Sequence, residues 1–272
     1  MNDREKINKL PDRPTVHFVG AGPGDPELIT VKGRRLLREA DLVIFTGSLV
    51  PRALVTGLKA EVHDSAGMNL DEVFELIHRA WKEGKKIVRL HTGDPAIYGA
   101  INEQMALFNK NSIPFRVVPG VSSGTASAAA LSTELTLPEV SQTVIFTRRA
   151  GRTPVPEKQD LISLASHQAT MMIFLSVGMI DRVVEDLLAG GYRENTPVAV
   201  VEKVSWPDER ILRGTLGTIA AEVKKAEITK TAIIAVGDVL AEGPPPALSK
   251  LYDSSFTHGY RRGSDGGKKN KK

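Results

Sequence analysis

The stretch VHFVGAGPGDPELIT, residues 16–30, places three glycines directly after a short apolar run. Residues 16–19 predict a buried strand, and the glycines predict a tight turn along which a ligand could approach the backbone. The dinucleotide fingerprint Gly-x-Gly-x-x-Gly runs on into a helix, but here the residue three places after Gly22 is Asp25. The stretch therefore predicts a ligand loop of another kind.

Composition bounds the class of protein. The chain has 272 residues, of which 41% are hydrophobic, and this is enough to bury a core. It has no cysteine, which excludes disulfides and thiolate-bound zinc, and its six histidines show no metal-ligand spacing, so we expect no protein-bound metal. The charged N-terminus lacks the apolar core of a signal peptide, and no apolar run is long enough to span a bilayer. We therefore expect a soluble, cytoplasmic protein with no membrane partner.

The positive charge lies at the two ends of the chain. The last 30 residues hold seven Lys or Arg against two acids, and the first 14 hold four against three. The rest of the chain therefore carries about −2 of the net charge of +4. We expect residues 243–272 to be disordered and, because the body is slightly acidic, we expect no nucleic-acid partner.

Short Val/Ile-rich runs alternate with amphipathic stretches, which is the pattern of strands joined by crossover helices. In the first half we expect strands at 16–19, 42–45, 87–90 and 115–118, and helices at 28–39, 70–82 and 100–109. In the second half we expect strands at 143–146, 171–175, 198–202, 211–213 and 232–236, with helices near 180–188 and 216–226. The predicted fold class is α/β, with two α/β domains, the first with a mainly parallel sheet and the second with a mixed sheet. Their expected bounds are 15–125 and 126–242, after an N-terminal extension, 1–14, and before the basic tail.

Two further loops, HTGDPAIYG (91–99) and PGVSSG (119–124), follow predicted strands. Because the carboxyl ends of parallel strands share one edge of a sheet, we expect all three loops to converge on one crevice. The second strand ends in TGS rather than in an acid that would bind the ribose of a dinucleotide, and the chain contains no Walker sequence. The loops also carry no Lys or Arg directed at phosphate, so a ligand with an adenosine and without a pyrophosphate, such as S-adenosylmethionine, would fit them.

The motifs VGAGPGDPELITVKG, HTGDPAIYGAINEQ, PGVSSGTASAAA, TRRAGRTPVPE and SWPDE occur in this order along residues 16–240. Their order and spacing closely resemble the tetrapyrrole methylases and, within them, the precorrin-4 or cobalt-precorrin-4 C11-methyltransferases of cobalamin biosynthesis. The resemblance implies an enzyme that methylates C11 of precorrin-4 to give precorrin-5. It also implies a homodimer, with S-adenosylmethionine in a cleft between two domains and an open trough for the tetrapyrrole. The GDPAIYG stretch looks more like that of the enzymes that act on cobalt-containing precorrin-4 than that of the enzymes that act on the metal-free form.

The resemblance also implies the residues of the site. The implied cofactor contacts, taken by motif position, are Pro23, Thr92, Gly93, Asp94, Ile97, Ser122, Ser123, Leu175, Val204 and Ala232. Asp94 is in addition a catalytic candidate that could face the substrate, or it could cap a helix that begins after Pro95.

The candidate substrate residues are three arginines and two aromatic residues. Arg148, Arg149 and Arg152 supply three cations in five residues for the acetate and propionate side chains of a precorrin. Arg148 and Arg152 match the family motif, whereas Arg149 does not match it clearly. Tyr98 and Trp206 are candidates to line the trough.

Other interpretations stay open. Methylases with similar glycine loops act on uroporphyrinogen III, on other precorrins, on diphthamide precursors or on ribosomal RNA, so another substrate within the superfamily is the first alternative. A nicotinamide-dependent oxidoreductase, and a non-catalytic RNA-binding protein that uses the basic tail, are alternatives from other classes.

Overall fold

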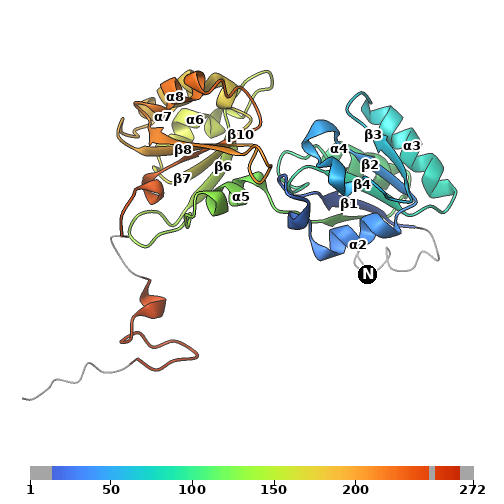
Figure 1. The fold of residues 1–272 in the computed structure, drawn as a ribbon, viewed down its shortest axis with the longest axis horizontal. Coiled ribbons are helices and arrows are strands. Elements are labelled where there is room, and N and C mark those ends of the chain that lie inside the picture. Colours follow the sequence, from blue (N-terminus) through green and yellow to red (C-terminus); the bar gives the residue numbers. More distant parts are fainter. Residues whose placement is uncertain (1–13, 245–248, 264–272) are drawn as a thin grey trace, which may run out of the picture. The chain divides into compact units, whose positions relative to one another are not determined.

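The computed structural model describes residues 14–244 and 249–263 (Figure 1). The described residues divide into two compact units, one built from 14–126 together with 203–209, and the other from 127–202, 210–244 and 249–263. Each unit has its own five-stranded sheet, the first parallel and the second mixed. The predicted fold class, two α/β domains, is confirmed.

The first unit has a wholly parallel sheet with the strand order β3-β2-β4-β1-β5. Its strands are β1 (Val16–Gly20), β2 (Leu42–Phe45), β3 (Glu61–Asp64), β4 (Ile87–His91) and β5 (Phe115–Val118). Its helices are α2 (Val31–Glu39), α3 (Leu70–Lys82) and α4 (Asn102–Lys110). One face of the sheet packs against Leu37 of α2, and the other packs against Ile77 of α3 and Phe108 of α4. Both faces are therefore buried, which explains the continuous apolar runs of these strands.

Local capping sets the helix bounds in this unit. The Thr30 hydroxyl accepts a hydrogen bond from the Gly33 amide, so α2 begins at Val31 rather than at residue 28, and a short 3-10 helix, Pro26–Leu28, precedes it. The prediction for α3 is confirmed, and a capping box between Asn69 and Glu72 starts it. Strand β3 was not predicted, because its EVHD sequence is charged and lies exposed at the sheet edge.

The second unit has a sheet with the strand order β6-β7-β10-β8-β9, in which only β6 and β7 run parallel. Its strands are β6 (Val144–Arg148), β7 (Thr170–Phe174), β8 (Pro197–Glu202), β9 (Arg210–Thr215) and β10 (Ala232–Val236). Its helices are α6 (Leu161–Ala165), α7 (Ile180–Ala189) and α8 (Ile219–Lys225), while α5 (Ser123–Ala130) runs across the division between the units. The core of this unit joins the three helices to one face of the sheet. A hairpin around WPDE, residues 206–209, joins β8 to β9, since Glu202 of β8 lies opposite Arg210 of β9.

The predicted N-terminal extension, 1–14, and the predicted disordered tail, 243–272, lie largely outside the described residues, because 1–13, 245–248 and 264–272 are not described. The described part of the tail, 249–263, holds a 3-10 turn, Lys250–Tyr252, and a backbone bridge between His258 and Arg261. Within 14–244 and 249–263, no helix combines the length and the apolar composition needed to cross a bilayer.

Candidate functional site

The loops after β1, β4 and β5 meet at the carboxyl edge of the parallel sheet. The Ala21 amide donates to the His91 carbonyl at 2.7 Å, and Gly22 and Gly93 exchange backbone hydrogen bonds of 3.3 and 2.8 Å. The Gly120 amide in turn donates to the carboxylate of Asp94 at 3.2 Å. The prediction that these three loops converge is confirmed.

The close approach of the loops requires glycine. A Cβ on Gly20 would lie 2.6 Å from the Gly120 Cα and 2.6 Å from the Gly93 carbonyl oxygen, which is shorter than real Cβ contacts. A Cβ on Gly120 would lie 2.8 Å from the Gly20 Cα. The obstructing atoms all belong to the backbone, so they cannot turn aside as a flexible side chain would. Each loop therefore fixes the positions of the other two.

Asp94 braces two of these loops. One carboxylate oxygen accepts from the Ala96 amide at 2.8 Å, and the other accepts from Gly120 in the third loop. The expectation that Asp94 caps a helix after Pro95 is wrong, because residues 95–98 form a turn and α4 begins only at Asn102. Both oxygens are thus occupied by loop amides, which makes Asp94 a structural anchor of the site.

Besides the carboxylates of Asp25 and Asp94, the loops carry hydroxyls and backbone groups. Thr92 lies 3.5 Å, oxygen to oxygen, from the hydroxyl of Thr46, which follows β2. The buried Ser122 hydroxyl accepts from the Gly124 amide, and Ser123 is the first residue of α5. Gly93 has a φ of 60°, and its Cβ position has no neighbour closer than 3.8 Å. These loops therefore offer hydroxyl and backbone donors and acceptors beside the carboxylates of Asp25 and Asp94.

The tip of the β8–β9 hairpin, residues 203–209, belongs to the first unit and packs on the first glycine loop. The indole nitrogen of Trp206 donates to the Pro23 carbonyl at 2.9 Å, and the Asp25 amide donates to the Ser205 hydroxyl at 2.9 Å. Pro23 and Val204 are both buried. The structure therefore gives Trp206, predicted as a trough residue, a structural contact with the first glycine loop.

A strained segment follows the second loop. Tyr98 and Ala100 have φ values of 53° and 48°, a left-handed conformation that costs energy in residues other than glycine. The Gln104 side chain donates to the Ala100 carbonyl and accepts from the buried guanidinium of Arg89, which also donates to the Ile44 carbonyl. Burial lowers the pKa of Arg89 to about 10. This polar chain ties the strained segment, with its half-exposed Tyr98 ring, to the sheet.

His91 ends β4 directly before the second loop, is buried, and lies against the ring of Phe18. Burial, with a smaller contribution from the Arg89 charge, lowers the pKa of His91 to about 3. Its Nε2 atom has no hydrogen-bond partner among the described residues. His91 is therefore neutral at physiological pH and serves as packing.

The predicted cofactor residues of the second unit lie at strand ends. Leu175 follows β7 with a φ of 54°, and 71% of its surface is exposed. Ala232 begins β10, where it pairs with Glu202 of β8 and is buried. An exposed leucine held in a left-handed conformation is costly, and such strain persists chiefly at functional sites.

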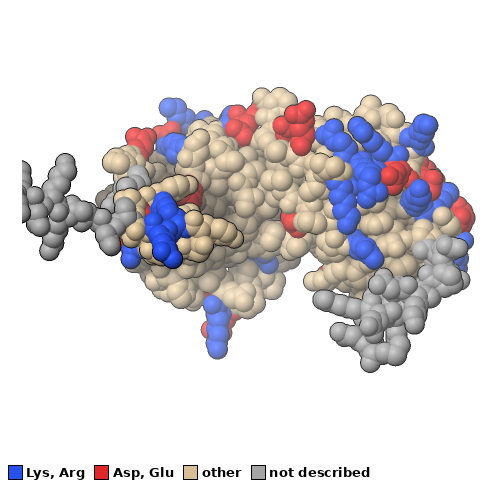
Figure 2. Space-filling model, turned by 90° about the horizontal axis from the view of Figure 1, so that it is seen from below, with Lys and Arg blue, Asp and Glu red and all other residues tan. Residues whose placement is uncertain are grey.

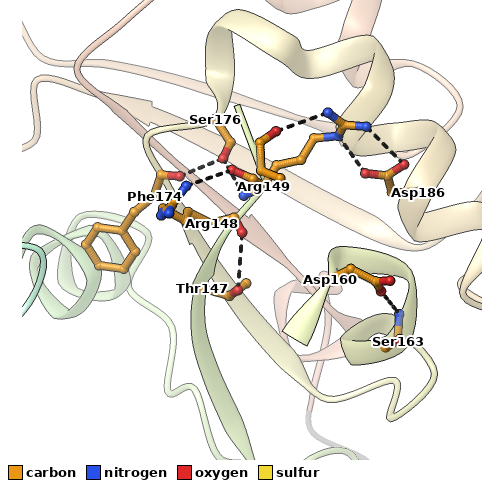
Figure 3. A network of polar contacts seen from close by, with 9 residues as sticks. Thr147, Arg148, Arg149, Asp160, Ser163, Phe174, Ser176 and Asp186 are labelled. Atoms are coloured by element: carbon orange, nitrogen blue, oxygen red, sulfur yellow. Dashed lines mark hydrogen bonds and ion pairs between the residues drawn. The ribbon is translucent and has the colours of Figure 1, made fainter. Parts of the chain in front are cut away.

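Three arginines at the end of β6 and just after it have different surroundings, and Figure 3 shows those of Arg148 and Arg149. Arg149 forms an ion pair with Asp186 of α7 at 2.6 Å, and its amide donates to the Ser176 hydroxyl. The Arg148 guanidinium donates to carbonyls of its own loop, including Pro154 at 2.7 Å. Arg152 is exposed and has no hydrogen bond or ion pair to any residue in the described ranges. Only Arg152 thus presents a guanidinium whose donors are available.

Basic side chains also gather on the surface of the first unit (Figure 2). In that unit, Lys32 and Arg35 of α2 and Arg116 of β5 lie close enough to His17 to lower its pKa, with burial as the larger cause. Arg35 pairs with Glu39 of the same helix. Within the described parts of the chain, no three His, Asp or Glu side chains are grouped as a metal site would require.

Sequence reasoning missed four residues that support the loops, namely Arg89, Gln104, Asp186 and Ser205. One of them left a signal: an arginine in the middle of the buried strand IVRLH needs hydrogen-bond partners inside the fold. The others act through partners far away in the sequence, and no local pattern marks them.

Comparisons with known proteins agree with this geometry. The family model of the tetrapyrrole (corrin/porphyrin) methylases matches residues 15–220. The chain is 58% identical to the cobalt-precorrin-4 C(11)-methyltransferase of Methanocaldococcus jannaschii over 249 residues, which is 91% of this chain and 96% of that relative.

Two solved structures are similar. The cobalt precorrin-4 methyltransferase CbiF, a cobalamin biosynthetic enzyme, has a TM-score of 0.82 and 46% identity, covering 84% of this chain and 96% of its own. The uroporphyrin-III C-methyltransferase of Thermus thermophilus, complexed with S-adenosylhomocysteine, has a TM-score of 0.71 and 29% identity, covering 83% and 98%. The resemblance carried by the glycine loops is confirmed, and the chain belongs to the tetrapyrrole (corrin/porphyrin) methylase family.

Proposed function

We propose that this chain is an S-adenosylmethionine-dependent C-methyltransferase that adds a methyl group at C11 of precorrin-4, or of cobalt-precorrin-4, in cobalamin biosynthesis. The product is then precorrin-5 or its cobalt form. The observation that carries the proposal is the meeting of three glycine loops at one sheet edge, in a chain 58% identical to a cobalt-precorrin-4 C(11)-methyltransferase. An RNA-binding role is not favoured, because the matching motifs lie in the folded units and not in the tail.

The chemistry of the loops fits this cofactor. Methyltransferases of this family use S-adenosylmethionine, and one similar structure holds S-adenosylhomocysteine. The loops present backbone groups and hydroxyls and carry no Lys or Arg, so they suit a ligand with an adenosine and without a pyrophosphate. Gly93 has a φ of 60°, which favours glycine, and the absence of a side chain there allows a ligand to approach the backbone.

The proposed cofactor contacts are grouped by unit. Those of the first unit are Pro23, Thr92, Gly93, Asp94, Ile97, Ser122, Ser123 and Val204, and those of the second are Leu175 and Ala232. In the first unit these residues come from the three converging loops and from the hairpin tip, whose mutual hydrogen bonds fix their spacing. The exposed, strained Leu175 supports a ligand contact at the end of β7.

The reaction asks mainly for alignment. The bound cofactor supplies an activated methyl group on a sulfonium, and a carbon of the tetrapyrrole is the nucleophile. The rigid loops hold the reactants in line, and such positioning can lower a barrier by roughly 7–11 kcal/mol. Asp94 contributes by bracing the second loop against the third, since both of its oxygens already accept loop amides. No residue need act as a general base in the methyl-transfer step itself.

The substrate residues are proposed on charge and exposure. Precorrins carry acetate and propionate groups, and a guanidinium binds carboxylates in a bidentate manner. Arg152 offers its donors to the substrate, Arg148 shapes the loop that presents Arg152, and Arg149 is already neutralised by Asp186. We propose Tyr98 as a further substrate contact, because its ring stands half-exposed on a rigidly held strained segment.

The test is an anaerobic incubation of the enzyme with S-adenosylmethionine and either metal-free or cobalt-containing precorrin-4, followed by mass spectrometry. We expect one added methyl group, and we expect the cobalt form to react faster, in line with the GDPAIYG motif. A Gly93→Leu variant that remains folded should give no product. Wild-type protein that leaves both forms unmethylated would contradict the proposal.

We also propose a homodimer and a cytoplasmic location, both in line with the family resemblance. Light scattering coupled to gel filtration should give twice the chain mass of 29.5 kDa. A monomer mass at micromolar concentration would contradict the dimer. Fractionation of cells from the source organism should recover the enzyme in the cytoplasmic fraction.

A further inference from the structure

We propose that the hairpin tip 203–209 is a clamp that positions the first glycine loop for the cofactor, and that Trp206 is the positioning residue through which it acts. This inference rests on the proposed function, because it assigns the clamp to the loop that carries Pro23. It gives Trp206 a role in holding the cofactor loop and not in contacting the tetrapyrrole.

The tip contacts the first glycine loop at three consecutive residues, Pro23, Gly24 and Asp25. Trp206 donates its indole hydrogen to the Pro23 carbonyl at 2.9 Å, and Ser205 accepts from the Asp25 amide at 2.9 Å. Between these two hydrogen bonds the indole ring covers Gly24, where a Cβ would lie 2.5 Å from the ring nitrogen. Gly24 is therefore glycine because the ring occupies the space of its side chain.

The tip is itself rigid. Its backbone folds on itself, since the Trp206 amide donates to the Lys203 carbonyl and the Glu209 amide donates to the Trp206 carbonyl. The Glu209 carboxylate accepts from the Ser205 amide at 2.6 Å, and Lys203 forms an ion pair with Asp208. These closely spaced contacts over seven residues stabilise the conformation in which the tip packs on the first glycine loop.

Strain in the tip supports a functional role. Lys203 and Ser205 have φ values of 47° and 64°, which are unfavourable for residues with a side chain. Lys203 and Ser205 flank the buried Val204 and directly precede Trp206. The strained backbone therefore orients the Ser205 hydroxyl and the Trp206 indole toward the first glycine loop. Strain of this kind persists when the position that it secures matters.

The chain offers a matched control for Trp206. Its two tryptophans each donate an indole hydrogen bond to a proline carbonyl at 2.9 Å, Trp206 to Pro23 and Trp81 of α3 to Pro14. Replacement of either by phenylalanine keeps an aromatic ring and removes that donor. Both variants should lose stability, but only Trp206→Phe should disturb the glycine loop.

Calorimetry with S-adenosylhomocysteine separates the two roles. We expect Trp206→Phe and Ser205→Ala each to weaken binding by about 5- to 10-fold, the loss typical of one hydrogen bond, and Trp81→Phe to bind as the wild type does. In turnover, the KM for S-adenosylmethionine should rise by the same factor, while kcat at saturating cofactor stays within about two-fold of wild type.

Fluorescence gives an independent readout that does not depend on whether Trp206→Phe folds. The Trp81→Phe protein keeps Trp206 as its single tryptophan, and its emission should change when S-adenosylhomocysteine is added. Wild-type affinity in Trp206→Phe and Ser205→Ala, or unchanged emission from Trp81→Phe at saturating ligand, would overturn the clamp. Failure of the wild-type protein to bind S-adenosylhomocysteine would instead contradict the proposed function.

Discussion

Replacement of Gly20 by alanine tests the packing of the three loops. The added Cβ would lie 2.6 Å from backbone atoms of both Gly93 and Gly120, whereas real Cβ contacts are longer than 3.0 Å. The second and third loops must therefore each move by about half an ångström. A misplacement of positioning groups by about 1 Å can lower a reaction rate by about 100-fold. For the shift of about half an ångström we expect Gly20→Ala to weaken S-adenosylhomocysteine binding by about 10-fold, or about 1.4 kcal/mol.

The assay is calorimetric titration of the folded variant with S-adenosylhomocysteine, with circular dichroism to establish that the fold is kept. Gly67→Ala is the matched control, because no atom lies within 4 Å of its Cβ position and its φ is ordinary. We expect Gly67→Ala to bind like the wild type. Wild-type affinity in a folded Gly20→Ala protein would refute the argument that loop contact sets the cofactor site.

Three further outcomes are expected. Arg152→Ala should lower kcat/KM for the tetrapyrrole, which corresponds to a loss of about 1.5–3 kcal/mol in transition-state stabilisation, without changing S-adenosylhomocysteine affinity. Arg152→Lys should restore kcat/KM only in part, because lysine keeps the charge and loses the planar guanidinium. Unchanged kinetics in both variants would show that the substrate carboxylates bind elsewhere. Arg149→Ala leaves the half-buried Asp186 without its cation and should lower the free energy of unfolding by about 1–3 kcal/mol, whereas Arg193→Ala, in an exposed ion pair, should cost less than about 0.5 kcal/mol in the same urea titration. Equal losses of unfolding free energy in Arg149→Ala and Arg193→Ala would contradict the larger contribution expected of the more buried ion pair. The pKa of His91 is lowered from 6.5 to about 3 in the folded protein, so as the pH falls the unfolded state is protonated at His91 before the folded state is. The free energy of unfolding should therefore decrease by up to about 1.4 kcal/mol per pH unit from pH 6.5 towards pH 3. Urea titrations of wild type and His91→Gln check this: the variant should have the flatter profile, and equal slopes would show that His91 is not buried as a neutral ring.

The convergence of the glycine loops could be predicted because each signal is local. A glycine turn after an apolar strand is visible in the sequence, and the parallel arrangement places the carboxyl ends of the strands at one edge. The same local logic located α3, because its apolar residues recur at three- and four-residue spacings.

The partners of individual side chains could not be predicted, because they lie far apart in the chain. Trp206 meets Pro23 across 183 positions, and Arg149 meets Asp186 across 37. A tryptophan beside a turn and an arginine in a basic loop both suggested substrate contacts, but the fold supplied nearer partners. Asp94 was ambiguous for the same reason, since its second partner, Gly120, is in another loop.

Short or exposed elements were missed for a different reason. Strand β3 is a four-residue edge strand with charged residues at both ends, so it shows no apolar run. Helix α6 has five residues and is too short to show a helical repeat. Both depend on the rest of the unit for their stability and carry little signal of their own.

The position of the transferred methyl group tests the central claim most directly. The enzyme is incubated anaerobically with precorrin-4, in its metal-free and cobalt forms, and S-adenosylmethionine labelled with carbon-13 in its methyl group, and the product is analysed by NMR. The proposed function predicts one labelled methyl group, attached to C11. A labelled methyl at any other carbon, or unlabelled tetrapyrrole from enzyme that binds S-adenosylhomocysteine, would contradict it.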